Sequence, residues 1–215
     1  MIRIGLRWPP WQEPDERVAA FVDGFNVYHG LHDKGFQRFY WLDYRALVET
    51  FVRPGQALVA VKYFTARVKK PAESKKRQST YLDALDAHGG LEIIEGKYVH
   101  RSVKCRECSA TRDRPNEKMT DVNVATHLVA GAIRDEYDTA ILICADADLV
   151  PAVRVAQGEG KRIIVVSPRG RTSADLVAES DSHLHFSTSA LGKCQLPDLV
   201  PGQGGIELRR PDTWT

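Results

Sequence analysis

The sequence predicts an α/β fold built on a central, largely parallel sheet. Short apolar runs alternate with amphipathic segments of helical length along most of the chain. Such alternation is typical of parallel sheets, because each parallel crossover needs a connecting helix. No internal repeat is visible, and 215 residues are enough to bury one sizeable core. We therefore expect one main domain.

The elements follow in order from the spacing of apolar residues. We expect strands at 18–23, 57–64, 91–95, 97–103 (a strand or an arm), 139–144 and 161–166, and an edge strand flanked by His183 and His185. We expect helices at 25–33, 43–52, 72–88, 118–134 and 148–158. Residues 1–16 are interpreted as an N-terminal arm, 17–190 as the domain with a basic insertion around 97–117, and 191–215 as a C-terminal tail. Breaker-rich composition predicts loose attachment at both ends.

Three aspartates lie where strands are expected to end. Asp23 closes the first apolar run, and Asp146 and Asp148 follow the run at 140–144. Ligands of open parallel sheets bind outside the carboxyl ends of the strands. Asp121 lies near the start of the helix expected at 118–134, four residues after Glu117, so these two are expected to share a helix face. A helix-capping role is the alternative for Asp121.

Carboxylates gathered in this way repel unless a cation or protons compensate them. Oxygen ligands alone suit Mg²⁺ or Mn²⁺. Such an ion lowers the pKa of a bound water and neutralises charge on a phosphodiester. The four aspartates therefore predict metal-assisted hydrolysis.

Three segments carry a family resemblance. FVDGFNVY, EKMTDVNVA and ILICADADLVPAVRVAQGEGKRIIVV, in this order and spacing, resemble the NYN domain family of PIN-like ribonucleases over about residues 17–187. The resemblance implies a three-layer, Rossmann-like (PIN-like) fold with helices on both sheet faces, an acidic pocket for Mg²⁺ or Mn²⁺, and cutting or processing of RNA. It implies metal-ligand roles for Asp23, Asp121, Asp146 and Asp148, and a helper role toward metal or phosphate for Asn26.

Two departures from the family pattern matter for activity. The family often has Ser-Gly-Asp-x-Asp where this chain has Cys144 and Ala145 before Asp146, so a hydroxyl is missing. His127 stands where another acidic residue is common. The leading hypothesis is a metal-dependent endoribonuclease, and the alternative is a catalytically weak or inactive RNA-binding or regulatory module. A haloacid-dehalogenase-type phosphatase would need an aspartate where Phe25 stands.

The net charge is only +2, but basic residues cluster along the chain. A cluster leads into the helix bearing Asp121, and such clusters hold a phosphate backbone without reading sequence. A solvated face is the alternative. The residues expected to bind RNA in the insertion and beyond the last core strand are Lys97, Arg101, Lys104, Lys118, Ser167 and Arg169, the last two of which could instead shape the turn at Pro168. Candidates for base stacking, with core packing as the alternative, are Phe25, Tyr28, Tyr63, Phe64 and Tyr98.

Cys105 and Cys108 form a Cys-x-x-Cys pair in a charged segment. Such a pair supplies half of a structural Zn²⁺ site, which a second chain could complete across a homodimer. Cys144 is expected to be a small buried hydrophobe. No apolar run is long enough to span a membrane and no signal-peptide core is visible, so we expect no membrane association and a cytoplasmic protein.

Overall fold

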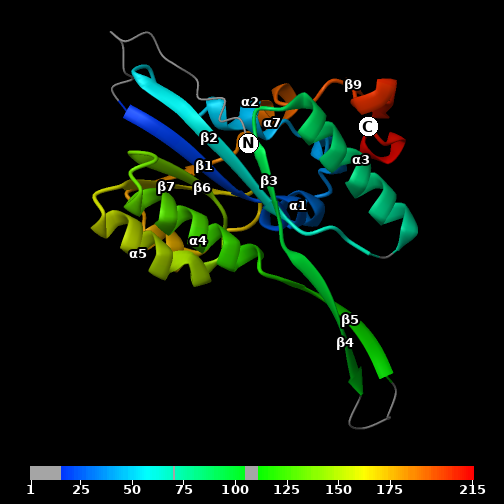
Figure 1. Cartoon of the computed structure of the whole chain (residues 1–215), viewed down its shortest axis with the longest axis horizontal. Helices are drawn as coiled ribbons and strands as arrows, with labels where there is room; N and C mark the ends of the chain where they lie inside the picture. Colours follow the sequence, from blue (N-terminus) through cyan, green and yellow to red (C-terminus); the bar gives the residue numbers. More distant parts are fainter. Residues whose placement is uncertain (1–15, 70, 105–110) are drawn as a thin grey trace.

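The core of the structure is a six-stranded sheet in which every neighbouring pair is parallel. The computed structural model describes residues 16–69, 71–104 and 111–215, with side chains described outside 99–117. The strand order is β3-β2-β1-β6-β7-β8 (Figure 1). The strands of this sheet are β1 (Glu16–Asp23), β2 (Gln56–Thr65), β3 (Glu92–Glu95), β6 (Thr139–Ile143), β7 (Arg162–Ser167) and β8 (Ser182–His185).

The order of the strands reverses between β1 and β6. From β1 the chain winds outward through β2 to β3, then returns to place β6 against the other side of β1 and winds outward through β7 to β8. The register pairs Val22 of β1 with Ile143 of β6, so the two strands end side by side. Ligand sites of doubly wound sheets lie at such a reversal.

Helices cover both faces of the sheet (Figure 1). Successive strand residues face opposite sides, and in β1 Val18 and Ala20 belong to one core, whereas Ala19 and Phe21 belong to the other. The expected three-layer α/β fold is therefore confirmed. The first core contains α1 (Gly24–Asp33), α2 (Tyr44–Glu49), α3 (Ala72–His88) and α7 (Thr188–Lys193), and the second contains α4 (Thr120–Ile133), α5 (Val150–Gly158) and α6 (Ala174–Glu179).

An antiparallel hairpin, β4 (Lys97–Lys104) with β5 (Thr111–Lys118), extends away from the body of the domain (Figure 1). Its base pairs Lys97 with Lys118. Glu117 lies in β5, and α4 begins only at Thr120, after Met119 with a left-handed φ of 83°. The expectation that Glu117 and Asp121 share a helix face is therefore wrong, because the strand continues through Glu117 and the backbone turns at Met119.

The C-terminal residues pack against the domain, so the expectation of a loose tail is wrong. A two-stranded sheet of β9 (Leu199–Pro201) and β10 (Glu207–Arg209) lies against α3. Trp214 is buried, with ring centroids 5.4 Å from Tyr40 and 5.8 Å from Tyr81.

At the amino-terminal end, the residues expected to form an arm lie outside the described residues except for Glu16, which begins β1. The short 3₁₀ helices are η1 (Gln37–Phe39), η2 (Ala147–Leu149), η3 (Gln203–Gly205) and η4 (Asp212–Trp214).

An ion pair joins β1 to the turn before β6 at the amino ends of these strands. The Arg17 backbone N–H and side-chain Nε both donate to Asp138 Oδ2, at 2.7 and 3.0 Å, and Arg17 Nη2 donates to Oδ1 at 2.7 Å. The Asp138 N–H donates to the Arg17 carbonyl at 2.9 Å. Hydrogen bonds from Arg17 hold the pKa of Asp138 below its usual value.

Asp138→Asn should lower the free energy of unfolding at pH 7 by about 1 kcal/mol, a modest figure because the pair is partly exposed and screened. A carboxyl whose pKa is lowered by folding stabilises the protein above its unfolded-state pKa and loses this contribution as pH falls through the folded-state value. Urea unfolding at a series of pH values should therefore show the difference from the native chain shrinking below about pH 4.

The control for this substitution is Asp86→Asn, at an exposed position of α3. It should change the free energy of unfolding by less than about 0.5 kcal/mol. A loss at Asp138 that is equally large at low pH would contradict the charge-based explanation.

Candidate functional site

Asp23 is the centre of the site at the carboxyl ends of β1 and β6. Its side chain is 1% exposed and caps α1 by accepting a hydrogen bond from the Asn26 N–H at 3.0 Å. The next residue is Gly24, where a larger side chain would clash with Tyr63. A Cβ at Gly24 would be 2.5 Å from the Tyr63 ring. The Asp-Gly sequence thus allows the strand to turn into a helix beneath this ring.

Asn26 links the start of α1 to the loop after β6. Its Nδ2 donates to Oδ2 of Asp23, and its Oδ1 accepts from the Ala145 N–H at 3.3 Å. One amide side chain therefore fixes the orientation of the Asp23 carboxylate relative to the loop that carries Asp146 and Asp148.

Cys144 provides a second link between the same groups. Its thiol is 3.6 Å from Asp23 Oδ2 as a donor, and its sulfur accepts from the Asp146 N–H at 3.3 Å. Cys144 is buried, as expected, but it also takes part in polar contacts on both sides. It therefore lies between two of the carboxylates, at the position where the resemblance implies a serine hydroxyl.

The remaining aspartates lie at the same sheet edge. Asp146 is half-buried and accepts from the Asp148 N–H at 2.9 Å, which caps η2, and Asp148 is exposed. Asp121 is half-buried in the first turn of α4. Because α4 leads back into the parallel strand β6 and packs beside η2, its amino end lies at the carboxyl edge of the sheet.

The electrostatic environment of Asp23 is unusual. Burial raises the pKa of its carboxyl, and hydrogen bonds from Asn26 and Cys144 oppose this rise. Burial, and then the neighbouring Asp23 charge, raise the pKa of the Cys144 thiol well above its usual value. The hydrogen-bond donors to Asp23 within the described part of the chain are neutral. A buried carboxylate supported by neutral donors is the kind of oxygen ligand that suits a divalent cation.

The four aspartates share an edge without forming a compact cluster. Among the side chains that the structure describes, no three His, Cys, Asp or Glu residues form a group that could hold a metal ion. The structure instead shows one chain of hydrogen bonds running from Asp23 through Asn26 and Cys144 to Asp146 and Asp148. Carboxylate oxygens are the type of ligand that Mg²⁺ and Mn²⁺ prefer, although these aspartates do not form a closed ligand set within the described part of the chain.

The residues expected to contact phosphate differ in their surroundings. Ser167 is fully buried at the end of β7, and its hydroxyl is 2.8 Å from His183 Nε2, which favours a structural role. Arg169 is exposed, with its guanidinium 5.5 Å from the centre of the Phe36 ring. Lys97 and Lys118 are exposed at the base of the hairpin. Arg101 and Lys104 lie in β4, but their side chains, together with Cys105 and Cys108 and their expected Zn²⁺ site, fall outside the described residues.

His127, which stands in place of a family acidic residue, contacts β2. Its Nδ1 is 3.4 Å from Lys62 Nζ, and its ring packs edge-on to Phe64 at 5.5 Å. Burial, and then the Lys62 charge, lower the pKa of His127. His127 therefore packs beside the second core and takes part in none of the described hydrogen bonds of the carboxylates.

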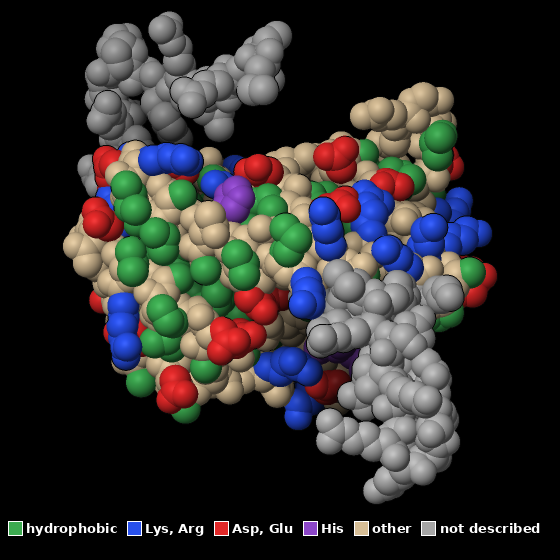
Figure 2. Space-filling view, turned by 60° about the horizontal axis from the view of Figure 1, so that its bottom comes forward, with side chains coloured by type: hydrophobic (Ala, Val, Ile, Leu, Met, Phe, Trp, Pro, Cys, Tyr) green, Lys and Arg blue, Asp and Glu red, His purple; other side chains and the backbone are tan. Residues whose placement is uncertain are grey.

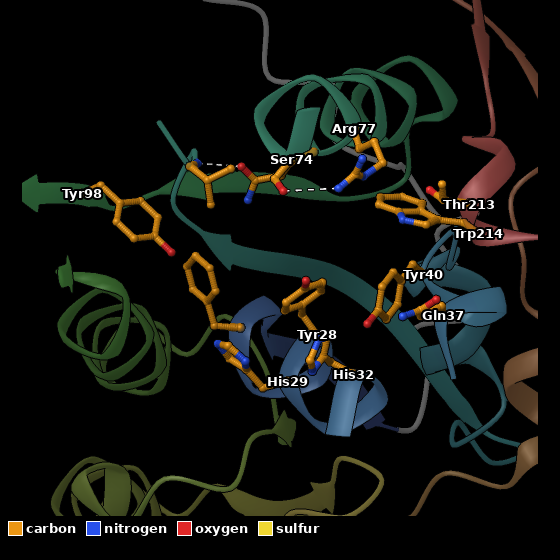
Figure 3. A pocket seen from close by; sticks show the side chains of 13 residues that line it. Tyr28, His29, His32, Gln37, Tyr40, Ser74, Arg77, Tyr98, Thr213 and Trp214 are labelled. Atoms are coloured by element: carbon orange, nitrogen blue, oxygen red, sulfur yellow. Dashed lines mark hydrogen bonds between the residues drawn. The ribbon is translucent and has the colours of Figure 1, made fainter. Parts of the chain in front are cut away.

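A cavity of about 360 Å³ beside α1 has aromatic walls (Figure 3). Sequence reasoning named three of its aromatic residues, Phe25, Tyr28 and Tyr98, as stacking candidates, but missed Tyr40 and Trp214. The spacing of Phe25, Tyr28, His29 and His32 is the signal that was available, because these positions form one face of a helix. Nothing local links this stripe to Trp214, which is almost two hundred residues away in a segment rich in breakers.

The described helices include none with the length and hydropathy to cross a bilayer. The homodimer and the cytoplasmic location stay predictions.

The comparison with known proteins agrees with the fold. The sequence pattern of the NYN domain matches residues 17–188. The 6-hydroxy-3-succinoylpyridine 3-monooxygenase of Pseudomonas putida is 28% identical over 241 residues, covering 92% of this chain and 75% of that protein. A solved structure of a protein of unknown function from Vibrio parahaemolyticus has a TM-score of 0.58 at 22% identity, covering 82% of this chain and 96% of that chain, and so shares its fold. Because the NYN pattern spans most of its length, this chain belongs to the NYN domain family.

Proposed function

We propose that this protein is a metal-dependent endoribonuclease that hydrolyses RNA phosphodiester bonds. The observation that carries the proposal is the buried carboxylate of Asp23, tied through Asn26 and Cys144 to the loop that bears Asp146 and Asp148. This arrangement stands at the switch in strand order, where open α/β sheets bind their ligands. Membership of a family with a nuclease-like fold supports it.

In this proposal Asp23, Asp121, Asp146 and Asp148 hold Mg²⁺ or Mn²⁺. The bound ion supplies activation of the attacking water and neutralises charge on the phosphodiester. Asn26 keeps the Asp23 carboxylate in one orientation and holds the Ala145 backbone beside it. Fixing ligands through such outer contacts is a common way of tuning a metal site.

The RNA backbone would approach along a basic surface. Lys and Arg side chains gather on the side of the molecule where α3 lies (Figures 1 and 2). The exposed Lys97 and Lys118 stand together at the base of the hairpin, just before the helix that carries Asp121. Arg101 and Lys104 extend this series along β4, and Arg169 lies exposed after β7. Such contacts hold phosphates without reading sequence, so binding should weaken with salt.

A second candidate function is chemistry on a small heterocyclic molecule. The relative in Pseudomonas putida is named for action on a substituted pyridine, and this chain has an aromatic cavity beside the acidic edge. For a ribonuclease the cavity would take a nucleotide of the RNA, and for an enzyme of small heterocycles it would take the free heterocycle.

Asp146→Asn should reduce metal-dependent RNA cleavage by about 100-fold or more, because loss of even an outer contact of a metal ligand typically costs about 10- to 100-fold. Asparagine has nearly the same size and is an equally good helix cap, so the thermal midpoint should barely change. The measurement is cleavage of a mixed set of labelled RNAs by equal amounts of folded native and variant protein, with Mg²⁺, Mn²⁺ or a chelator.

Asp175→Asn, at an exposed position in the first turn of α6, is the matched control and should cleave at the native rate. Cleavage that survives in Asp146→Asn would reject the four-aspartate site. RNA binding without cleavage by the native protein under any metal would favour the catalytically inactive RNA-binding module.

Cys144→Ser should raise the cleavage rate severalfold, because a hydroxyl forms shorter and stronger hydrogen bonds than a thiol. Cys144→Ala should lower it, since Asp23 and the Asp146 N–H would each lose a partner. Single-turnover rates with labelled RNA compare the three proteins. Cys194→Ser, at a buried cysteine after α7, is the control and should leave the rate unchanged. A serine variant slower than the alanine variant would contradict this role.

A further inference from the structure

The aromatic cavity lies between α1, η1, the amino-terminal part of α3, the start of β4 and η4. Its volume of about 360 Å³ is within the range of small-molecule sites, about 300–1,000 Å³. One stripe of α1 lines it, with side chains at helical spacing: Phe25, Tyr28, His29 and His32. The first of these is two residues from Asp23, so the cavity adjoins the acidic edge.

Aromatic rings form the walls of the cavity (Figure 3). The Tyr40 ring lies 5.0 Å from Tyr28 and 5.4 Å from Trp214, and Phe25 lies 5.9 Å from Tyr98. Tyr28 is 43% exposed, although it belongs to this group of rings. Exposed aromatic faces in a cavity are surfaces on which a planar ring can stack.

The Tyr40 hydroxyl is a buried polar group without a hydrogen-bond partner of good geometry in the described part of the chain. Tyr40 is 8% exposed, and burial, followed by the neighbouring Tyr28, raises the pKa of its hydroxyl, which therefore stays protonated and able to donate. Leaving a buried hydroxyl unpaired costs free energy, so proteins usually satisfy such groups. Because Tyr40 lines the cavity, a polar atom of a bound molecule would supply the missing partner.

Arg77 brings a positive charge to the same cavity. Its Nη2 donates to Ser74 Oγ at 3.2 Å, and it forms no ion pair with a carboxylate among the described residues. Both residues belong to the first two turns of α3, where the helix dipole favours an anion. Several other arginines are engaged by carboxylates: Arg17, Arg45, Arg67, Arg154 and Arg171.

We propose that this cavity binds a planar nitrogen heterocycle joined to an anionic group. The ring stacks among Tyr28, Tyr40 and Trp214 and offers a polar atom to the Tyr40 hydroxyl, and the anion pairs with Arg77. Two sources present this chemistry: a nucleotide of an RNA strand, and a free heteroaromatic acid. The proposal concerns binding alone, so it does not require that the protein cleaves RNA.

The test measures binding by calorimetry in the presence of a chelator, so that no metal-dependent cleavage takes part. The probes are adenosine and uridine 5′-monophosphates, a short oligouridylate, pyridine-3-carboxylate, and benzoate as a ring without nitrogen. We expect saturable binding of at least one nitrogen-containing probe, and weaker binding of benzoate than of pyridine-3-carboxylate.

Arg77→Gln should weaken that binding at least tenfold. Lys76→Gln, which removes the same charge from the neighbouring, exposed position outside the cavity, should leave the binding of monomeric probes unchanged. The two variants separate a pairing with Arg77 from general attraction to Lys75 and Lys76, the exposed lysines of α3.

Tyr40→Phe should weaken binding but leave the thermal midpoint unchanged or higher, because it removes a buried hydroxyl that has no hydrogen-bond partner of good geometry among the described residues. Tyr81→Phe is the contrasting variant, since the Tyr81 hydroxyl donates to the Leu42 carbonyl at 2.7 Å and its loss should lower the thermal midpoint. A folded Tyr40→Phe protein therefore isolates the contribution of the hydroxyl to binding.

Preferential binding of the nucleotides or the oligouridylate would support the proposal with RNA as the source. Preferential binding of pyridine-3-carboxylate would support it with a free acid as the source. The proposal is overturned if none of the nitrogen-containing probes binds the native protein, or if binding is unaffected by both Arg77→Gln and Tyr40→Phe. Neither result alters the cleavage assay with Asp146→Asn, so failure of this site and failure of the nuclease assignment are distinguishable.

Discussion

The parallel pairing of β1 with β6 is the constraint on which the site depends. Because Val22 lies opposite Ile143, Asp23 and Cys144 leave the sheet as neighbours although they are far apart in the sequence. Asn26 reaches the backbone of the next loop only because α1 begins immediately after β1. The local turn and the long-range strand pairing thus act together, and a shift in either would separate the carboxylates from their neutral donors.

The aspartates at the two ends of this strand pair lie in opposite electrostatic environments. At the amino ends, Asp138 is paired with Arg17, and hydrogen bonds lower its pKa. At the carboxyl ends, Asp23 is buried among neutral donors, and its pKa is raised. A buried charge without a cationic partner opposes folding, so selection for stability alone would not place it there. Functional sites commonly retain destabilising groups of this kind, which is in keeping with the metal site that we propose.

The parts of the fold set by local pattern were predictable from the sequence. Apolar runs ending in Asp23 or preceding Asp146 predicted both strands and their shared edge. The pattern of residues gave wrong expectations where backbone geometry or contacts with distant residues determine the structure. The charged residues before Met119 do not show the alternation of a half-buried strand, so β5 was missed and Glu117 was placed on a helix. Trp214 follows a run of prolines and glycines, and its burial depends on rings contributed by other parts of the chain.

Helix α1 connects the proposed metal site to the cavity that we propose binds a heterocycle. Asn26 contacts the carboxylate loop, whereas Phe25 and Tyr28, on another face of the same helix, line the aromatic cavity. The helix is capped by Asp23 itself, and Gly30 allows close packing against the loop after β7, where a Cβ would be 2.6 Å from the Arg169 carbonyl. With both ends fixed, α1 holds the cavity at a constant position relative to the carboxylates. If the proposed ligand occupies the cavity, this fixed helix would hold it in one orientation relative to the proposed metal site.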